Sequence, residues 1–223
     1  MTFYFGDLLP YSGQLAAALW TSVYITLIAM AVGSAFGVLL YVGKTGTNPV
    51  FRRLCWWYVE AFRNTPLLVQ LYLIYFGLPE LGVNLNPTWA GIVALTLNNA
   101  AYTAEIYRAG FEAVPPGLVE AGQALGMRRS QVFRHIELMP ATRNVFPALT
   151  NQFILLFLAS SIASIIGLPE LMNAVLNINN QTYRTFEILA VGGGLYFVVS
   201  LILSLASKAA ESYFFRWGVS GRA

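Results

Sequence analysis

Five long, predominantly apolar stretches dominate the sequence, and we interpret each as a membrane-spanning helix. A helix needs about 20 apolar residues to cross the hydrocarbon core of a bilayer. The first stretch, residues 8–43, has no charged residue and leaves room for one such helix and a polar approach. The others run over about residues 54–78, 88–110, 142–166 and 185–207. The pattern therefore predicts an all-α fold with five transmembrane helices.

The connection between the third and fourth stretches, residues 112–140, has a different pattern. Apolar positions recur there at helical spacings, but Gly126 interrupts them, and glycine costs about 1 kcal/mol inside a helix. We therefore expect two short amphipathic helices joined at Gly126, after Pro115 and Pro116 and before Pro140. Such a segment is either an anchor on the membrane surface or a helix that fills a groove in a partner protein. Periodicity alone favours the anchor.

Composition indicates an integral membrane protein. Of 223 residues, 57% are hydrophobic and 10% are charged, whereas a soluble domain has about 25% charged residues. The net charge is only +3 and the basic residues are scattered, so we expect no nucleic acid partner. The N-terminal segment lacks the basic region of a cleaved signal sequence, so the first stretch is expected to remain as a span. Residues 1–223 are interpreted as one transmembrane domain.

Basic residues predict the orientation, because Lys and Arg are enriched in cytoplasmic connections. The connections at residues 80–87 and 167–183 contain neither Lys nor Arg. The basic residues instead follow the first stretch, lie between the third and fourth, or close the chain: Lys44, Arg52, Arg53, Arg128, Arg129, Arg134, Lys208, Arg216 and Arg222. We therefore predict an external N-terminus, a cytoplasmic C-terminus and a cytoplasmic 112–140 segment.

Several motifs carry a resemblance to one family. Glu120-Ala121, then Gly126, then Ile136, Leu138 and Pro140 resemble the "EAA" coupling loop of ATP-binding cassette importer permeases. The segments "FRNTPLLVQLYLIYFGLP" (62–79), "NNAAYTAEIYRAGFEAVPPG" (98–117) and "PALTNQFILLFLASSIASIIGLPEL" (147–171) resemble its polar amino acid branch, the histidine, glutamine, arginine and glutamate type. Two departures stand out: Gly122 replaces the usual alanine, and Met139 separates Leu138 from Pro140.

The resemblance implies a type I importer permease in the bacterial cytoplasmic (inner) membrane. Such a subunit pairs with a second permease, identical or paralogous, and with two cytoplasmic ATPase subunits. A periplasmic or lipid-anchored binding protein delivers the substrate. The chain itself would not be an enzyme and would hold no cofactor, because ATP is bound and hydrolysed by the ATPase chains. Transport would proceed by alternating access.

The same resemblance assigns the 112–140 segment to ATPase coupling rather than to anchoring. The residues expected at this contact are Glu120, Ala121, Gly126, Arg128, Arg129 and Phe133. A secondary transporter or channel working without an ATPase stays open as an alternative, as does a structural scaffold for a membrane complex.

Two other functions are set aside on residue chemistry. The segment "GVLLYVGKT" (37–45) has five residues between its glycines, whereas a phosphate-binding loop needs four, and it ends a predicted span. The lone His135 lies among arginines, so a surface or docking role is favoured over metal binding and no metal site is expected.

Polar residues within the predicted spans mark a candidate substrate path, because such groups are costly in a membrane and are usually functional or paired. Glu60 with Arg63 and Glu105 with Arg108 have the three-residue spacing of a same-face pair, so structural pairing and a transport role are both open. Pro66 removes a helical hydrogen bond, and a broken helix with a nearby cation suits an amino acid carboxylate. The candidate path comprises Arg63, Gln70, Asn98, Asn99, Tyr102, Glu105, Ser161 and Ser164.

The sequence "GLPEL" occurs at residues 77–81 and 167–171. Glycine followed by proline favours helix termination at both places. A second interpretation is that Glu80 and Glu170 face the docking binding protein.

Overall fold

The structure, a computed structural model, describes residues 4–214, so the predicted cytoplasmic Arg216 and Arg222 lie outside the described residues. Every regular element within residues 4–214 is helical, which confirms the all-α prediction. Here α marks α-helices and η marks 3-10 or π-helical turns. The elements are η1 (Gly6–Tyr11), α1 (Ser12–Thr45), α2 (Pro49–Arg63), α3 (Leu67–Tyr72), η2 (Leu73–Gly77), η3 (Leu78–Leu81), α4 (Pro87–Glu112), α5 (Pro116–Ala124), α6 (Arg129–Val132), η4 (Phe133–Glu137), α7 (Leu138–Ala159), η5 (Ser160–Ile166), α8 (Leu171–Thr182) and α9 (Thr185–Phe214).

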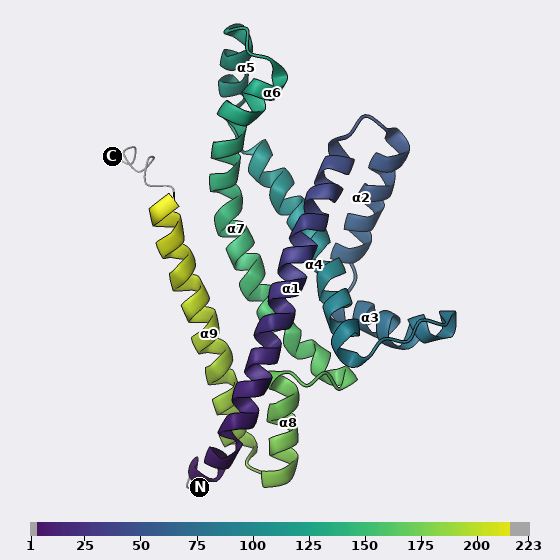
Figure 1. Ribbon diagram of the computed structural model, residues 1–223, viewed down its shortest axis with the longest axis vertical. Coiled ribbons are helices and arrows are strands. Elements are labelled where there is room, and N and C mark those ends of the chain that lie inside the picture. Colours follow the sequence, from purple (N-terminus) through teal and green to yellow (C-terminus); the bar gives the residue numbers. More distant parts are fainter. Residues whose placement is uncertain (1–3, 215–223) are drawn as a thin grey trace.

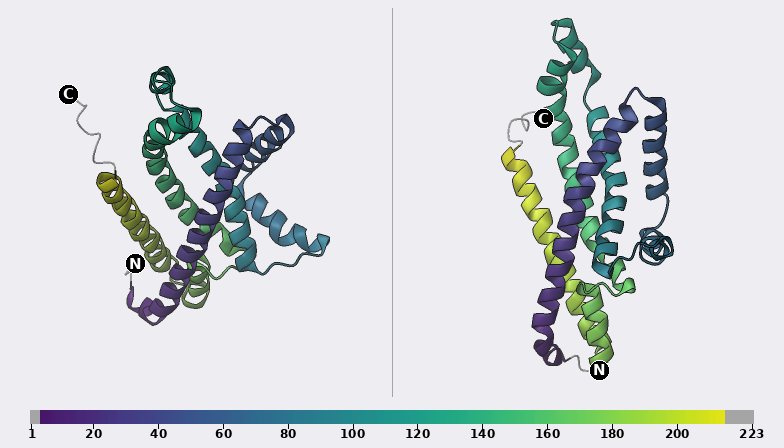
Figure 2. Two further views of the ribbon diagram at one scale, coloured as in Figure 1. Left: turned by 45° about the horizontal axis from the view of Figure 1, so that its top comes forward. Right: turned by 45° about the vertical axis from the view of Figure 1, so that its right-hand side comes forward.

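The long helices α1 and α4 cross at the centre of the molecule, and α7 packs against α4 (Figures 1 and 2). Glycines on α1 allow the close approach. A Cβ atom added at Gly37 would lie 2.1 Å from Thr103 Oγ1 and 3.0 Å from the Ala100 carbonyl oxygen. At Gly33 it would lie 2.8 Å from Asn99 Nδ2. Small residues at a contact let membrane helices pack by van der Waals attraction where lipid supplies no hydrophobic driving force.

The second predicted span is not one helix, which corrects the expectation of a continuous span over residues 54–78. α2 ends at Arg63, and α3 begins at Leu67. Pro66 has no N–H to donate and disfavours helical backbone at the residue before it, which explains the break. α3, η2 and η3 then turn sideways, away from the bundle (Figure 1).

The number of spans stays a prediction. Among residues 4–214, three helical segments are long and apolar enough to cross a membrane: Gly6–Thr45, Arg129–Ile166 and Thr185–Phe214. α4 has 26 residues, about 39 Å of helix, but polar residues such as Asn98 and Glu105 interrupt its apolar sequence. The predicted second span is divided between the 15-residue α2 and the short apolar helix Leu67–Leu81.

The segment predicted as two short helices joined at Gly126 has that form. α5 and α6 meet at Gly126, whose φ of 77° is left-handed and favours glycine. The expectation that Pro140 ends the second piece is wrong, because η4 leads directly into α7. Pro140 lies in the first turn of α7, where a missing N–H is tolerated best. The second short helix is therefore the start of a long rod.

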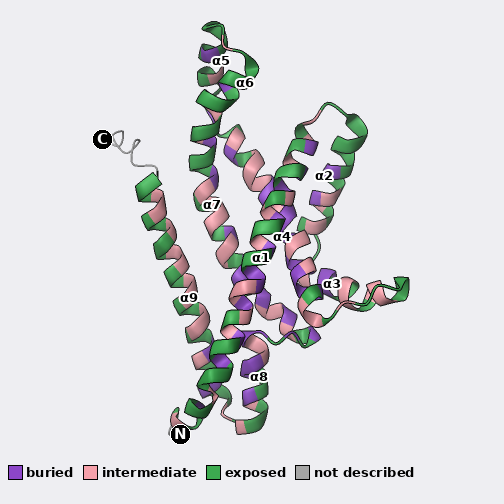
Figure 3. Ribbon diagram, viewed as in Figure 1, coloured by how far each residue is buried: buried purple, intermediate pink, exposed green. Residues whose placement is uncertain are grey.

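The second GLPEL segment ends a helical element as expected, since η5 stops at Ile166 and Gly167 has a left-handed φ of 79°. The expectation is wrong for the first segment, because helical turns continue through Gly77 and Pro79 and end only at Gly82, whose φ is 82°. The expectation that Glu170 faces a binding protein is wrong, because its side chain is fully buried, whereas Glu80 is exposed. α9 lies at the edge of the bundle, and most of its residues are exposed or half-buried (Figure 3). Its buried residues are only Glu187, Ile188 and Gly192.

Candidate functional site

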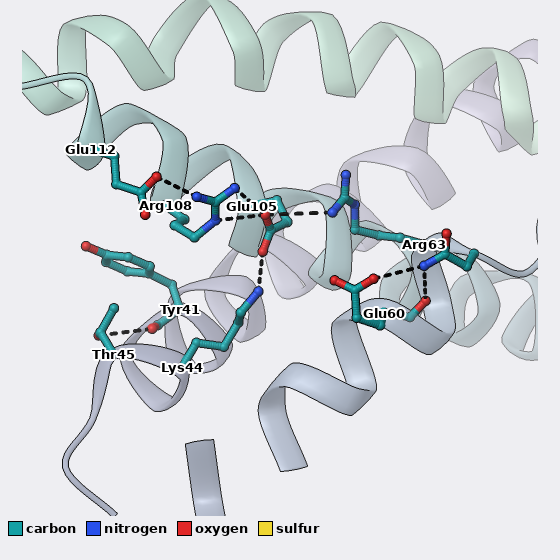
Figure 4. Close-up of polar contacts among 9 residues, drawn as sticks. Tyr41, Lys44, Thr45, Glu60, Arg63, Glu105, Arg108 and Glu112 are labelled. Carbon is teal, nitrogen blue, oxygen red and sulfur yellow. Dashed lines mark hydrogen bonds and ion pairs between the residues drawn. The ribbon is translucent and has the colours of Figure 1, made fainter. Parts of the chain in front are cut away.

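An ionic cluster centred on Glu105 joins three helices (Figure 4). Lys44 at the end of α1 donates a hydrogen bond to Glu105 Oε1. Arg108, one turn further along α4, lies 2.8 Å from Glu105 Oε2 through Nη2, and Arg63 at the end of α2 lies 3.7 Å away. The Glu105 side chain is only 13% exposed, so it needs these cations. One carboxylate thus ties the ends of α1 and α2 to α4.

Only one of the two predicted same-face pairs forms. Glu105 and Arg108 are paired, which confirms that expectation. The Glu60–Arg63 pair is absent from the described part of the chain, because Arg63 turns toward Glu105 and lies over the Tyr102 ring at 5.8 Å. Glu60 instead accepts a hydrogen bond from Asn64 Nδ2 at 3.0 Å.

The Gln70 side chain donates hydrogen bonds to backbone carbonyls that have no helical partner at the break before α3. Its Nε2 donates to the carbonyl oxygens of Phe62 at 2.8 Å and Thr65 at 3.0 Å. In a continuous helix the Phe62 carbonyl would accept from residue 66, but Pro66 has no N–H. Gln70 Oε1 in turn accepts from Asn98 Nδ2 at 3.1 Å. The break is therefore held in place by a side chain that also reaches α4.

Two open clefts lie along α4, between the end of α2 and α7. The smaller has a volume of about 460 Å³ and is lined by Arg63, Asn98 and Tyr102 with the Asn64–Pro66 break. The larger, of about 840 Å³, extends past Glu105 and Arg108 toward Asn144 and Glu211. Both clefts are lined by Arg63, Tyr102 and Gln152. Because these residues are shared, the two clefts adjoin along α4, and together they are called the passage below.

The other candidate path residues do not line these two clefts. Asn99 is fully buried, and its Nδ2 faces the Ala29 carbonyl of α1 at 3.4 Å. Ser161 and Ser164 donate to carbonyls of their own helix at 2.7 Å. These contacts are typical of helix packing. Asn99 therefore packs α4 against α1, and Ser161 and Ser164 bond within their own helical segment, outside the two clefts.

Gln152 is a lining residue that was not predicted from the sequence. It lies on α7, is 8% exposed, and donates to Asn99 Oδ1 at 3.2 Å. The sequence does indicate this residue, because Thr150, Asn151 and Gln152 are three consecutive polar residues inside an apolar predicted span.

The residues assigned to coupling gather at one tip of the molecule, where α5 and α6 project beyond the bundle (Figure 1). Glu120, Ala121, Arg128 and Arg129 are exposed there. Phe133 stacks on Phe111 at the end of α4, with ring centroids 5.7 Å apart and planes at 7°. Arg129 Nη1 lies 3.4 Å from Glu137 Oε1. The tip is thus connected directly to α4 and α7.

Two further residues at this tip explain its shape. A Cβ atom at Gly122 would lie 2.4 Å from Ile136 Cδ1, so Gly122 rather than Gly126 allows α5 to approach the following helix. Leu125, at the end of α5, is 82% exposed. Among the described residues no group of three or more His, Cys, Asp or Glu side chains could hold a metal ion.

Comparisons with known proteins agree on one family. The family described as "Binding-protein-dependent transport system inner membrane component" matches residues 29–212. The arginine transport system permease protein ArtQ of Bacillus subtilis is 36% identical over 208 residues, which are 93% of this chain and 95% of ArtQ. The octopine transport system permease protein OccM of Rhizobium radiobacter is 34% identical over 206 residues, 86% of this chain and 83% of OccM.

Solved structures give the same result. A crystal structure of an amino acid ABC transporter with histidines has a chain of 36% identity that superposes with a TM-score of 0.92, covering 96% of this chain and all of that one (100%). The MetNI methionine transporter, at 23% identity and a TM-score of 0.70, shares the fold. The type I permease fold is therefore confirmed. The chain belongs to the family of inner membrane components of binding-protein-dependent transport systems, the permease subunits of ATP-binding cassette importers, whose ATPase is a separate chain.

Proposed function

We propose that this chain carries a polar amino acid across the inner membrane along the two clefts beside α4. The observation that carries the proposal is the convergence of Arg63, Asn98, Tyr102 and Gln152 on one passage next to a broken helix. Relatives named for the transport of arginine, glutamine and octopine support an amino acid substrate. Family membership argues against a secondary transporter or a channel working without an ATPase.

The groups in the passage match the two charges that every amino acid carries. The Arg63 guanidinium is 37% exposed and 3.7 Å from Glu105, so it keeps N–H donors for a carboxylate. Gln152 lines the same cleft, and in this proposal its amide oxygen accepts from the ammonium group, while the Tyr102 ring holds the Arg63 guanidinium in place. In this proposal Glu105 balances the charge of the larger cleft. Gln70, Asn99, Ser161 and Ser164 have supporting roles, because their polar atoms are engaged within the bundle.

We infer that the coupling loop at about residues 112–140 is cytoplasmic and docks on an ATPase subunit through Glu120, Ala121, Gly126, Arg128, Arg129 and Phe133. The α1–α2 turn and the α5–α6 tip lie toward the same end of the molecule, and both carry basic residues (Figure 1). This arrangement supports an N-terminus outside and a C-terminus inside. Residues 1–223 would then form one transmembrane domain with five spans, the second being α2 with α3 to η3.

We further propose a complex of this permease with a second one, identical or paralogous, and with two ATPase subunits. A periplasmic or lipid-anchored binding protein would deliver the amino acid. The exposed edge of the bundle along α9 and the open side of the clefts support a second transmembrane subunit, because neither surface is closed by this chain alone. ATP would be bound only by the ATPase subunits.

Uptake by the complete complex in proteoliposomes tests this function. We expect ATP-dependent uptake of at least one polar amino acid, and a ten- to hundredfold loss at limiting substrate in Asn98→Ala, because hydrogen bonds to charged groups contribute about 1.5–3 kcal/mol each. Asn84→Ala, at an exposed asparagine outside the clefts, is the matched control and should transport normally. Uptake without ATP would contradict the proposed mechanism. Equal uptake by Asn98→Ala and wild type would move the substrate site elsewhere.

A further inference from the structure

A groove at the start of α2 is not explained by transport or by ATPase coupling. It has a volume of about 730 Å³ and is lined by Pro49, Arg52, Arg53, Trp56 and Trp57, with Lys44 at its edge. Its lining residues Lys44 and Pro49 flank the turn between α1 and α2, and this turn lies apart from the projecting α5–α6 tip (Figure 1). A chain docked on that tip therefore need not cover the groove.

The groove carries uncompensated positive charge. Arg52 and Arg53 are exposed, and within residues 4–214 neither side chain has an ion pair or a hydrogen bond. Glu60, the acidic residue of α2, lies seven residues from Arg53, about 10 Å along the helix. Lys44 at the edge is engaged by Glu105. The two guanidinium groups are thus free to bind an anion.

The exposed apolar side chains around the groove indicate that its anionic ligand is part of a lipid. Trp56 and Trp57 are 44% and 56% exposed, and their rings meet edge to face with centroids 5.0 Å apart. Val50, Phe51 and Leu54 on the same short helix are also more than half exposed, at 68%, 53% and 62%. Tryptophan is enriched at the headgroup level of membranes, and basic amphipathic helices bind there. A soluble anion would not require this apolar surround.

We propose that the groove binds the headgroup of an anionic phospholipid. Arg52 and Arg53 donate to the phosphate, and the aromatic and aliphatic side chains of α2 contact the upper acyl chains. Pairing of planar guanidinium donors with phosphate oxygens is geometrically favourable. The site would fix the α1–α2 hairpin at the membrane interface next to Lys44, which lines the groove and pairs with Glu105. It does not depend on the identity of the transported substrate.

Quenching of tryptophan fluorescence by brominated lipids tests the site in the complete complex, without ATP or substrate. Trp20, Trp89 and Trp217 are replaced by phenylalanine, so that Trp56 and Trp57 are the tryptophans of this chain that fluoresce. A second complex, in which Trp56 and Trp57 are replaced as well, gives the fluorescence of the partner chains, which is subtracted. Vesicles contain brominated phosphatidylglycerol or brominated phosphatidylcholine at matched mole fractions. We expect stronger quenching by phosphatidylglycerol, and a loss of about fivefold in this preference for each of Arg52→Gln and Arg53→Gln.

Controls separate the lipid site from other causes. Arg52→Lys with Arg53→Lys should retain much of the preference, and Lys208→Gln, which removes an exposed charge at the end of α9, should retain all of it. No preference for phosphatidylglycerol, or a preference unchanged in the glutamine variants, would overturn the proposal. So would competition by soluble glycerol phosphate, which would indicate a free phosphate site. Loss of a partner subunit in the glutamine variants would assign the arginines to a protein contact instead.

Discussion

Glu170 connects three helices through one buried carboxylate. Its Oε2 accepts hydrogen bonds from the Tyr196 hydroxyl of α9 at 2.8 Å and the Ser22 hydroxyl of α1 at 3.3 Å. Its Oε1 accepts from the Asn173 N–H at 2.8 Å, which caps α8. Burial raises the pKa of the Glu170 carboxyl above its ordinary value of 4.5. The residue therefore stabilises the packing of α1, α8 and α9 and does not form a docking surface.

Substitutions of Glu170 should separate hydrogen bonding from charge. Glu170→Ala leaves buried donors without an acceptor, at about 1–3 kcal/mol each, and should lower the unfolding midpoint of the purified complex by several degrees. Glu170→Gln keeps acceptors and should be milder. Because the pKa is raised in the folded state, wild-type stability falls as pH rises above 4.5 toward the folded pKa. This fall should be absent in Glu170→Gln, and an equal fall in both proteins would contradict the account.

At the residue scale, polar residues within the predicted spans include several that line the clefts, but polarity did not predict which face of a helix lies beside a cleft. Arg63, Asn98, Tyr102 and Glu105 line the clefts. Asn99 does not, because one step along an α-helix turns the side chain by about 100° and points it at α1 instead. The sequence alone does not tell which side of a nearly all-apolar helix faces a neighbour. That information comes from the glycines of α1, whose partners are known only in the fold.

At the element scale, local chemistry predicted where helices change direction but not where they lead. Pro66 marks the end of α2, and Gly126 marks the joint between α5 and α6. The continuity from α6 through η4 to α7 was not predicted, because Pro140 reads as a helix end. A π-helical turn at η4 precedes Pro140 and leaves it in the first turn of α7. A continuous helical segment therefore connects the tip to Gln152 beside the clefts.

Two variants of the tip should weaken coupling without unfolding the chain. Gly126→Leu forces a branched residue into a left-handed conformation, at about 1–2 kcal/mol, and should reduce ATPase binding about tenfold. Glu120→Lys reverses an exposed charge at the contact and should act in the same direction. Glu80→Lys, an exposed acid outside the tip, is the control. Pull-down of the ATPase subunit and ATP hydrolysis stimulated by the binding protein measure the effect, and normal values for both tip variants would exclude the assigned contact.

At the scale of the whole molecule, the two clefts lie along α4 on the side that faces α7. The lining of the larger cleft runs from Tyr102 past Arg108 to Glu211 near the end of α9. The smaller cleft is lined by Leu156 and Ile162 in addition to the residues around the Pro66 break. With the orientation proposed above, the larger cleft lies nearer the cytoplasm, and we expect it to be accessible from that side in the absence of ATP. Alternating access then requires that the end near α5 and α6 closes when the ATPase subunits do.

The side from which the passage is reached tests this account most directly. In a background with Cys55→Ser, single cysteines are introduced by Tyr102→Cys in the passage and by Thr103→Cys, whose side chain is buried against α1. Asn84→Cys and Asn179→Cys mark the outside, and Ser130→Cys marks the cytoplasm. A membrane-impermeant thiol reagent should modify Tyr102→Cys from the cytoplasmic side without ATP, and from the outside after trapping with ATP, vanadate and binding protein. Thr103→Cys should stay unreactive throughout. Reaction of Tyr102→Cys from both sides in one state, or from neither side in either state, would contradict a substrate passage beside α4.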